Sequence, residues 1–197
     1  MSQPVSKRAL WGAAAVVLVL LGGAWFSWVQ ASYPSDHEPR GAYVRIAEAV
    51  TRDEPEEFFA YLEDAAQHAC FTVRDYRRAA LARVRSAFPE KERRAYEERW
   101  AAFADAQGGA EVFALYARQE GWLEKLEVDL SRAAGVEVQG ERATVVTARG
   151  TRHSFRRRAG GIWGLTAFTP KLLSEAERAA RDLELIEKAA LDYERAR

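Results

Sequence analysis

The sequence contains few of the residues that build cross-linked or reactive sites. Cys70 is the single cysteine among 197 residues, so the chain cannot form an intramolecular disulfide. There are three histidines, and asparagine is absent. The chain also lacks an excess of either charge, because Lys and Arg number 29 and so do Asp and Glu. This balance argues against a nucleic-acid binder, which needs a net basic surface to displace counterions from phosphate groups.

One long segment lacks charge entirely. Residues 9–29 are uncharged, and Ser27 carries the only hydroxyl group among them. A helix of this length spans roughly 30 Å, the thickness of the hydrocarbon core of a bilayer. Trp11 lies near one end and Trp25 and Trp28 near the other, as in the aromatic belts of membrane helices. We therefore predict a single transmembrane helix that anchors the chain in a membrane.

The charges that flank this segment predict its orientation. Lys7 and Arg8 precede it directly, whereas Asp36 and Glu38 are the first charged residues after it. The positive-inside rule places residues 1–8 in the cytoplasm and the bulk of the chain outside. The absence of asparagine and the excess of arginine over lysine are typical of a GC-rich bacterial genome. The predicted location is the bacterial inner membrane, with the bulk of the chain on the periplasmic side.

A cleaved signal peptide is the alternative interpretation of the same segment. Val29-Gln30-Ala31 loosely matches the small-x-small pattern of a cleavage site, and cleavage after Ala31 would release the rest of the chain. Against cleavage, Trp25, Phe26 and Trp28 are bulky, and the apolar region of a signal peptide is usually about 7 to 15 residues long. Both interpretations place the rest of the chain outside the cytoplasm.

The remainder of the chain changes from helical to strand periodicity. Residues 42–133 show helical spacing, with Asp53 and Thr72 as predicted caps and Gly121 as a point that divides the fifth helix. Residues 136–168 are rich in β-branched and aromatic side chains and predict four short antiparallel strands in a meander. The predicted fold class is α+β, with helices packed on one face of the sheet. The predicted organisation is a cytoplasmic N-terminus over 1–8, a transmembrane helix over 9–29, a linker over 30–41, an extracytoplasmic domain over 42–168 and an amphipathic helix over 169–197.

The strand-rich segment "VEVQGERATVVTARGTRHSFRRRAGGIWGL" resembles the end of an extracytoplasmic nuclear transport factor-like (cystatin-like cone) domain. In that family a curved meander closes on helices and often finishes with a Gly-x-Trp strand, here Gly161-Ile162-Trp163. The chain departs from the family in the number of helices before the sheet and in its long C-terminal extension. Extracytoplasmic members are often non-catalytic, which the resemblance implies for this chain. As a whole, the chain is also similar to uncharacterised bacterial membrane-anchored proteins.

The segment "DAAQHAC" is the nearest approach to a metal site. Asp64 and His68 are four residues apart and share one helix face, as two ligands would. Cys70 lies about 200° around the helix from His68, so it cannot join them. We predict no metal site, a surface Asp-His pair and no catalytic residues. Beside Ala69 and Phe71, the thiol is expected to be buried and inert.

The densest basic segment is "RHSFRRR", residues 152–158. In a strand, His153 and Phe155 share a face with Arg157, and the remaining side chains point to the opposite face. A site for anions or lipid headgroups is one interpretation. The favoured one is a solvated strand whose charges prevent edge-to-edge aggregation. Net charge also alternates in sign from one segment of the chain to the next, which predicts that packed elements complement one another's charge.

The C-terminal segment carries an apolar seam in steps of four and three, the period of a coiled coil. Packing of this seam on the domain's own sheet is favoured, and contact with a protein partner or a second copy of the chain is the alternative. This possible partner surface consists of Leu172, Ala176, Ala179, Leu183, Ile186, Ala190 and Tyr193.

Together these patterns predict a single-pass, membrane-anchored protein with a non-catalytic extracytoplasmic domain. Its expected role is that of a scaffold or accessory subunit that acts through protein–protein contacts, without a cofactor and without nucleic acid. The alternative is an extracytoplasmic module, released by cleavage after Ala31, that binds a small apolar ligand inside a sheet curved around Trp163 and Phe168.

Overall fold

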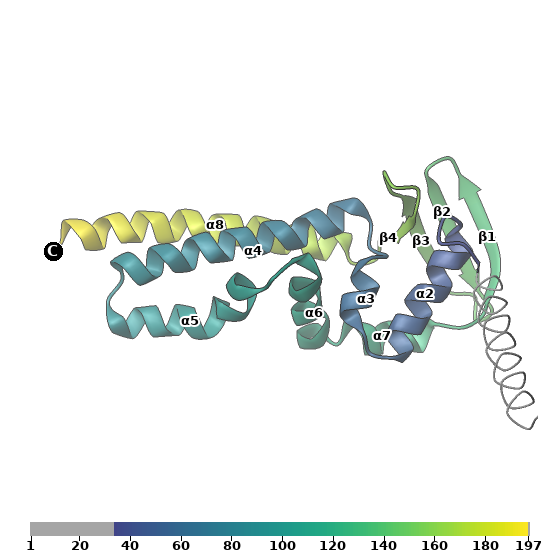
Figure 1. Cartoon of the computed structure of the whole chain (residues 1–197), viewed down its shortest axis with the longest axis horizontal. Helices are drawn as coiled ribbons and strands as arrows, with labels where there is room; N and C mark the ends of the chain where they lie inside the picture. Colours follow the sequence, from purple (N-terminus) through teal and green to yellow (C-terminus); the bar gives the residue numbers. More distant parts are fainter. Residues whose placement is uncertain (1–33, 197) are drawn as a thin grey trace, which may run out of the picture. The chain divides into compact units, whose positions relative to one another are not determined.

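The computed structural model describes residues 34–196, and a compact unit begins at Asp36. It is an α+β fold in which seven helices and a four-stranded sheet are described, which confirms the predicted class (Figure 1). The helices are α2 (Pro39–Thr51), α3 (Pro55–Phe59), α4 (Asp64–Ala87), α5 (Glu90–Asp105), α6 (Gly109–Glu120), α7 (Trp122–Asp129) and α8 (Thr169–Arg195). The strands are β1 (Ala133–Gln139), β2 (Arg142–Thr147), β3 (Arg152–Arg157) and β4 (Trp163–Leu165).

The predicted transmembrane helix over residues 9–29 lies outside the described residues, as do residues 1–8 and the first part of the predicted linker. Within residues 34–196, no helix combines the length and the apolar character that crossing a bilayer requires. Helix α2 begins at Pro39, inside the segment predicted as linker up to residue 41. A proline in the first helical turn explains this early start, because its missing N–H has no helical partner at that position.

The sheet is the predicted antiparallel meander, in the order β1-β2-β3-β4. Gln139 pairs with Arg142, so Gly140 and Glu141 form the two-residue turn that the sequence indicates. Gly140 has a φ of 59°, which suits the tight hairpin turn. Strand β3 is an interior strand, so the expectation that its arginines protect an open sheet edge is wrong.

The helix boundaries between residues 53 and 87 differ from the prediction. Thr72, predicted as a helix cap, lies inside the 24-residue helix α4. Its hydroxyl donates to the carbonyl oxygen of His68 at 2.9 Å, so it bonds backwards along the helix instead of capping a new one. The actual break lies between α3 and α4, where Leu62 forms a parallel bridge with Leu165 of β4.

Two hydrophobic clusters build the interior. The larger lies between the sheet and the helices α2, α3, α6 and α7, and it contains the fully buried Phe58, Phe113 and Phe155. The smaller joins α4, α5 and α8 through residues such as Leu81, Trp100 and Ile186. Helices α4 and α8 lie side by side and extend away from the sheet with α5 (Figure 1). We call these three helices the arm.

Candidate functional site

The C-terminal seam lies against α4 within the same chain. Leu172, Ala176, Ala179, Ile186 and Ala190 are buried, whereas the remaining two seam residues are partly exposed. Ion pairs reinforce the contact at two levels of the arm. The seam was expected to pack on the sheet of its own domain, and this expectation is wrong. Most of α8 extends beyond the sheet and packs along α4. Contact of the seam with another chain stays a prediction.

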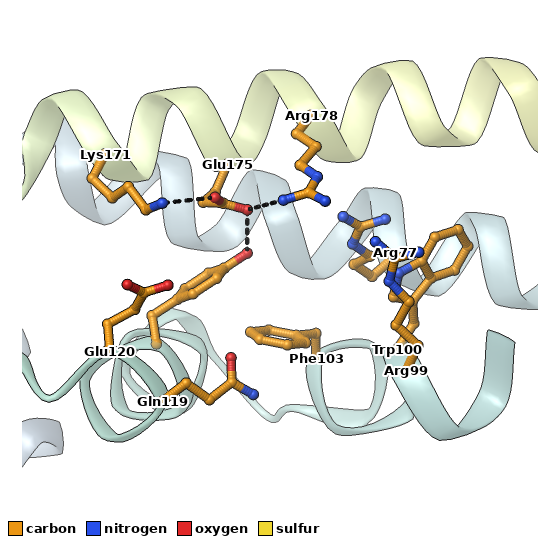
Figure 2. Close-up of a pocket in the computed structure, with 10 residues that line it drawn as sticks. Arg77, Arg99, Trp100, Phe103, Gln119, Glu120, Lys171, Glu175 and Arg178 are labelled. Atoms are coloured by element: carbon orange, nitrogen blue, oxygen red, sulfur yellow. Dashed lines mark hydrogen bonds and ion pairs between the residues drawn. The ribbon is translucent and has the colours of Figure 1, made fainter. Parts of the chain in front are cut away.

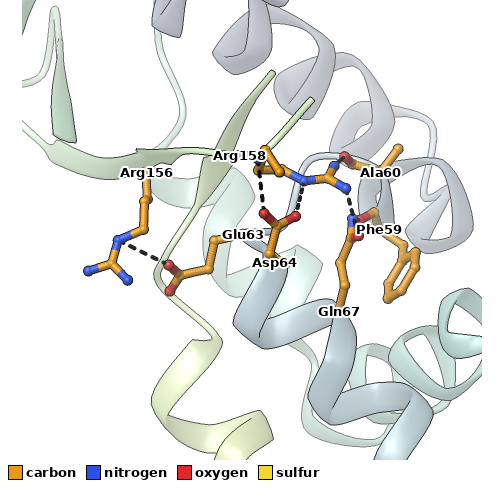
Figure 3. A network of polar contacts seen from close by, with 8 residues as sticks. Phe59, Ala60, Glu63, Asp64, Gln67, Arg156 and Arg158 are labelled. Atoms are coloured by element: carbon orange, nitrogen blue, oxygen red, sulfur yellow. Dashed lines mark hydrogen bonds and ion pairs between the residues drawn. The ribbon is translucent and has the colours of Figure 1, made fainter. Parts of the chain in front are cut away.

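The arginines of the basic segment pair with acidic groups of neighbouring elements. Arg158 makes the densest set of contacts: it donates to Asp64 at 2.7 Å, to the carbonyl oxygen of Ala60 at 2.5 Å and to the side chain of Gln67 at 2.8 Å (Figure 3). Arg156 lies 3.6 Å from the nearly buried Glu63. These contacts fasten the end of β3 to the break between α3 and α4, which favours the structural role of this segment. The other pairs are Arg152 with Glu137 and Arg157 with Glu141.

Asp64 forms its hydrogen-bonded pair with Arg158, and the charge of His68, its predicted partner, also acts on it. Burial alone would raise the pKa of Asp64, but its hydrogen bonds from Arg158 and from the backbone N–H of Ala159 outweigh burial and lower it. His68 is exposed on α4. Within residues 34–196, no three His, Cys, Asp or Glu side chains lie close enough to hold a metal ion.

Cys70 is fully buried among the apolar residues of the larger cluster. Burial raises the pKa of its thiol from 9.0 to about 12, so the thiolate fraction at neutral pH falls about a thousandfold. We expect iodoacetamide at pH 8 to leave the native chain unmodified and to alkylate Cys70 fully in 6 M guanidinium chloride. Rapid alkylation of the native chain, followed by mass spectrometry, would contradict this burial.

His153 is a buried titratable group on the inner face of β3. Its ring lies 5.4 Å from the ring of Tyr43, and its Nε2 atom has no hydrogen-bond partner among the described residues. Burial lowers the pKa of His153, and the hydrogen bond with the backbone of Asp129 only partly offsets this. Burial therefore favours the uncharged form of the His153 ring in the folded chain.

This burial predicts a pH dependence of stability. Because the pKa of His153 is lower in the folded chain than in the unfolded one, its contribution is fully present above about pH 6.5 and is lost as the pH falls towards the folded-state value. The free energy of unfolding, measured with urea at pH 7.5 and 5.5, is expected to fall at the lower pH. A His153→Phe variant should show a smaller decrease. An equal decrease in both proteins would exclude His153 as its source.

The two residues predicted to surround an apolar ligand take part in packed contacts. The indole N–H of Trp163 donates to the carbonyl oxygen of His37 at 3.0 Å. The ring of Phe168 stacks on Trp122 with centroids 4.8 Å apart and also contacts Phe58. Aromatic side chains thus fill the space beside Phe168, and the ligand-binding alternative stays a prediction.

A groove of about 300 Å³ lies between α8 on one side and α5 and α6 on the other, with α4 behind it (Figure 2). No local sequence pattern predicts this groove, because its lining comes from four helices that are distant in the sequence. Four of the lining side chains are cations and two are carboxylates. The lining residues are Arg77, Arg99, Trp100, Phe103, Tyr116, Gln119, Glu120, Lys171, Glu175 and Arg178.

Glu175 is the central acidic group of the groove and is only 9% exposed. It accepts a hydrogen bond from the Tyr116 hydroxyl at 3.4 Å and lies 3.4 Å from the Lys171 ammonium group (Figure 2). Arg178 lies 4.0 Å from the same carboxylate, which is too far for a hydrogen bond. Burial, and next the charge of Glu175, raise the pKa of Tyr116 well above its usual range. Tyr116 therefore stays protonated at neutral pH.

The guanidinium group of Arg77 is nearly buried behind the groove. It donates to Asp182 at 2.6 Å and lies 4.4 Å from the centroid of the Trp100 ring. Arg99 approaches the same ring at 5.8 Å. Figure 2 shows Arg77, Arg99 and Arg178 at the same end of the groove, beside Trp100. Two guanidinium groups, those of Arg77 and Arg99, thus contact one aromatic ring.

The two edges of the sheet differ. Residues 61–63 cover the edge of β4, because the Leu165 N–H donates to the Tyr61 carbonyl oxygen at 2.7 Å and the Leu165 carbonyl oxygen accepts from the Glu63 N–H at 3.2 Å. Strand β1 pairs with β2 alone, and no other described strand pairs with its outer edge. The β1 edge is therefore open for pairing among the described strands.

Strand β1 also exposes apolar side chains. Val136 and Val138 pair with Val145 and Ala143, which are buried, yet they are themselves 38% and 54% exposed. The strand contains neither lysine nor proline, which commonly protect an open edge, although its register is irregular between Ala133 and Gly135. An apolar hollow of about 310 Å³, lined by residues of α2 and of the segment before β1, opens beside its first residue.

Comparisons of this chain with known proteins found no match to a family model, to a curated protein or to a solved structure.

Proposed function

We propose that this chain is a single-pass protein of the bacterial inner membrane whose extracytoplasmic domain acts as a non-catalytic scaffold or accessory subunit. The anchor is the uncharged segment 9–29 with its terminal tryptophans. The open β1 edge is the single structural observation that carries the protein-binding part of the proposal.

The proposed binding mode is strand addition by a partner protein. An extended partner segment can continue the sheet beside β1, because an open edge presents unpaired N–H and C=O groups. Apolar side chains at alternating positions of that segment would cover Val136 and Val138 on one face of the sheet. Glu137 lies on the opposite face of the sheet, where it is exposed and pairs with Arg152 at 2.7 Å. Strand addition would therefore not bury its charge. The α8 seam has the weaker case, since most of it is buried against α4.

Location and orientation can be tested with a single introduced thiol. The native Cys70 is buried and unreactive, so Ala95→Cys on the exposed surface of α5 provides the reactive group. We expect the full-length variant in the membrane fraction, with labelling of intact spheroplasts by a membrane-impermeant maleimide. The wild-type chain is the control without label. Labelling only after lysis would overturn the orientation, and a soluble chain that begins at Ser32 would replace the anchor with the cleaved-signal alternative.

The partner surface can be tested by placing a charge on the β1 edge. Native mass spectrometry of the full-length chain in mild detergent is expected to show a particle larger than 22.1 kDa. Val138→Lys should reduce partner occupancy at least ~10-fold, because a desolvated lysine opposes strand addition. Val128→Lys, at an exposed position on α7, is the matched control and should retain the partner. A wild-type monomer, or a particle insensitive to Val138→Lys, would contradict binding at β1.

A further inference from the structure

We infer that the groove between α8 and the helices α5 and α6 binds a phosphate monoester whose apolar body rests on the aromatic floor. This ligand site goes beyond the proposed scaffold role and is separate from the β1 edge, so either can fail without the other. Three features of the groove favour such a ligand: its charge, the partners that its side chains already engage and its aromatic floor.

The charge balance of the groove favours an anion. Four cations face two carboxylates in the lining. Asp182 lies outside the lining and pairs with Arg77 at 2.6 Å, which reduces the excess to one positive charge and leaves Arg99 and Arg178 at the same end of the groove (Figure 2). Like charges that share a small site repel one another, and a bound anion removes this repulsion.

The N–H groups needed to hold the anion are available. A guanidinium group carries five N–H donors. Within the described residues, Arg99 makes a contact only with the Trp100 ring, and Arg178 approaches Glu175 no closer than 4.0 Å. Both side chains therefore have donors that can turn towards a phosphate group, whose oxygens match the planar guanidinium fork. Lys171 is the third exposed cation of the lining.

The floor of the groove is apolar and already ordered. Trp100, Phe103 and Tyr116 are all buried, and the rings of Phe103 and Tyr116 lie 4.8 Å apart. These rings supply an aromatic surface for a small apolar group next to the guanidinium groups. The volume of the groove, about 300 Å³, is large enough for a phosphate group that carries a small apolar body. The more buried of the two carboxylates, Glu175, is already bonded to Tyr116 and paired with Lys171.

The test uses phenyl phosphate and the full-length chain in a neutral detergent. Isothermal titration calorimetry is expected to show saturable binding at one site. Arg99→Gln and Arg178→Gln should each weaken binding at least ~10-fold, because each removes a charge-assisted contact to the phosphate. Arg94→Gln is the control: it removes an exposed arginine of α5 that pairs with Glu90 away from the groove. Circular dichroism of each variant verifies that the fold is unchanged, as expected for exposed side chains.

A second arm distinguishes a free phosphate monoester from a phospholipid headgroup. The full-length chain is placed in nanodiscs of phosphatidic acid or of phosphatidylcholine, and its unfolding temperature is measured. A ligand that binds only the folded chain raises this temperature. A rise in phosphatidic acid that Arg178→Gln removes assigns the site to a lipid headgroup, whereas binding of phenyl phosphate alone assigns it to a free ligand. No saturable binding up to ~10 mM and no lipid effect, or equal binding by wild type and both variants, would overturn the proposal.

Discussion

Replacing Ala179 with arginine is expected to lower the free energy of unfolding by about 4 kcal/mol or more, which is enough to detach α8 from α4. Ala179 lies in the middle of α8 and is fully buried. The nearest acidic groups along the helix are already engaged, since Asp182 binds Arg77 and Glu175 lies beside Lys171. The new cation would therefore be buried without a partner. Urea unfolding of the full-length chain, followed by circular dichroism, measures the effect.

The matched control is the same substitution at an exposed alanine of the arm. Ala79 lies on the exposed side of α4, so Ala79→Arg should change the free energy of unfolding by less than about 0.5 kcal/mol. If Ala179→Arg kept wild-type stability but abolished association with another chain, the α8 seam would be an intermolecular contact. The in-chain packing described for α8 would then be wrong.

The seam shows what periodicity can and cannot predict. Steps of four and three identify the side of α8 that is buried, and the structure buries Leu172, Ala176 and Ala190 on that side. The pattern contains no information on what covers it. The partner became evident only from long-range pairs such as Arg83 with Glu194, which join residues 111 positions apart.

The sheet was predictable because its information is local. Short strands with β-branched residues are separated by turns in which Gly140, Gly150 and Gly161 all have positive φ. The break between α3 and α4 was not predictable, because it depends on β4, which pairs with Leu62 from about a hundred residues away. Where local and long-range preferences disagree, as at Thr72, the tertiary contact determines the helix boundary.

The candidate site was beyond sequence reasoning for the same reason. Arg99 and Arg178 are separated in the sequence by two helices and the four strands of the sheet, and neither belongs to a motif. The basic segment 152–158 attracted attention through its density, yet several of its arginines are paired within the chain. The dense basic segment therefore forms ion pairs that hold the sheet and helices together. The groove instead combines charged side chains from separate helices, which no single segment of the sequence contains.

Replacing Gly164 with alanine is expected to cost about 3 kcal/mol of unfolding free energy. A Cβ atom at this position would lie 2.5 Å from the backbone nitrogen of Glu63 and 2.7 Å from the carbonyl carbon of Leu62. Both are backbone atoms, so the contact can be relieved only by moving β4 away from residues 61–63. Gly160→Ala is the control, because its Cβ would meet no atom within 4 Å. Urea unfolding of the two variants compares the effects directly.

The same substitution tests why the two edges of the sheet differ. Separation of β4 from residues 61–63 would release the hydrogen bonds of Leu165 with Tyr61 and Glu63 and would open a second edge. An open edge promotes association between chains, so Gly164→Ala should self-associate in size-exclusion chromatography while Gly160→Ala should not. If Gly164→Ala were as stable as wild type, the tight backbone contact would not exist. The closure of β4, which leaves β1 as the open edge among the described strands, would then lose its structural basis.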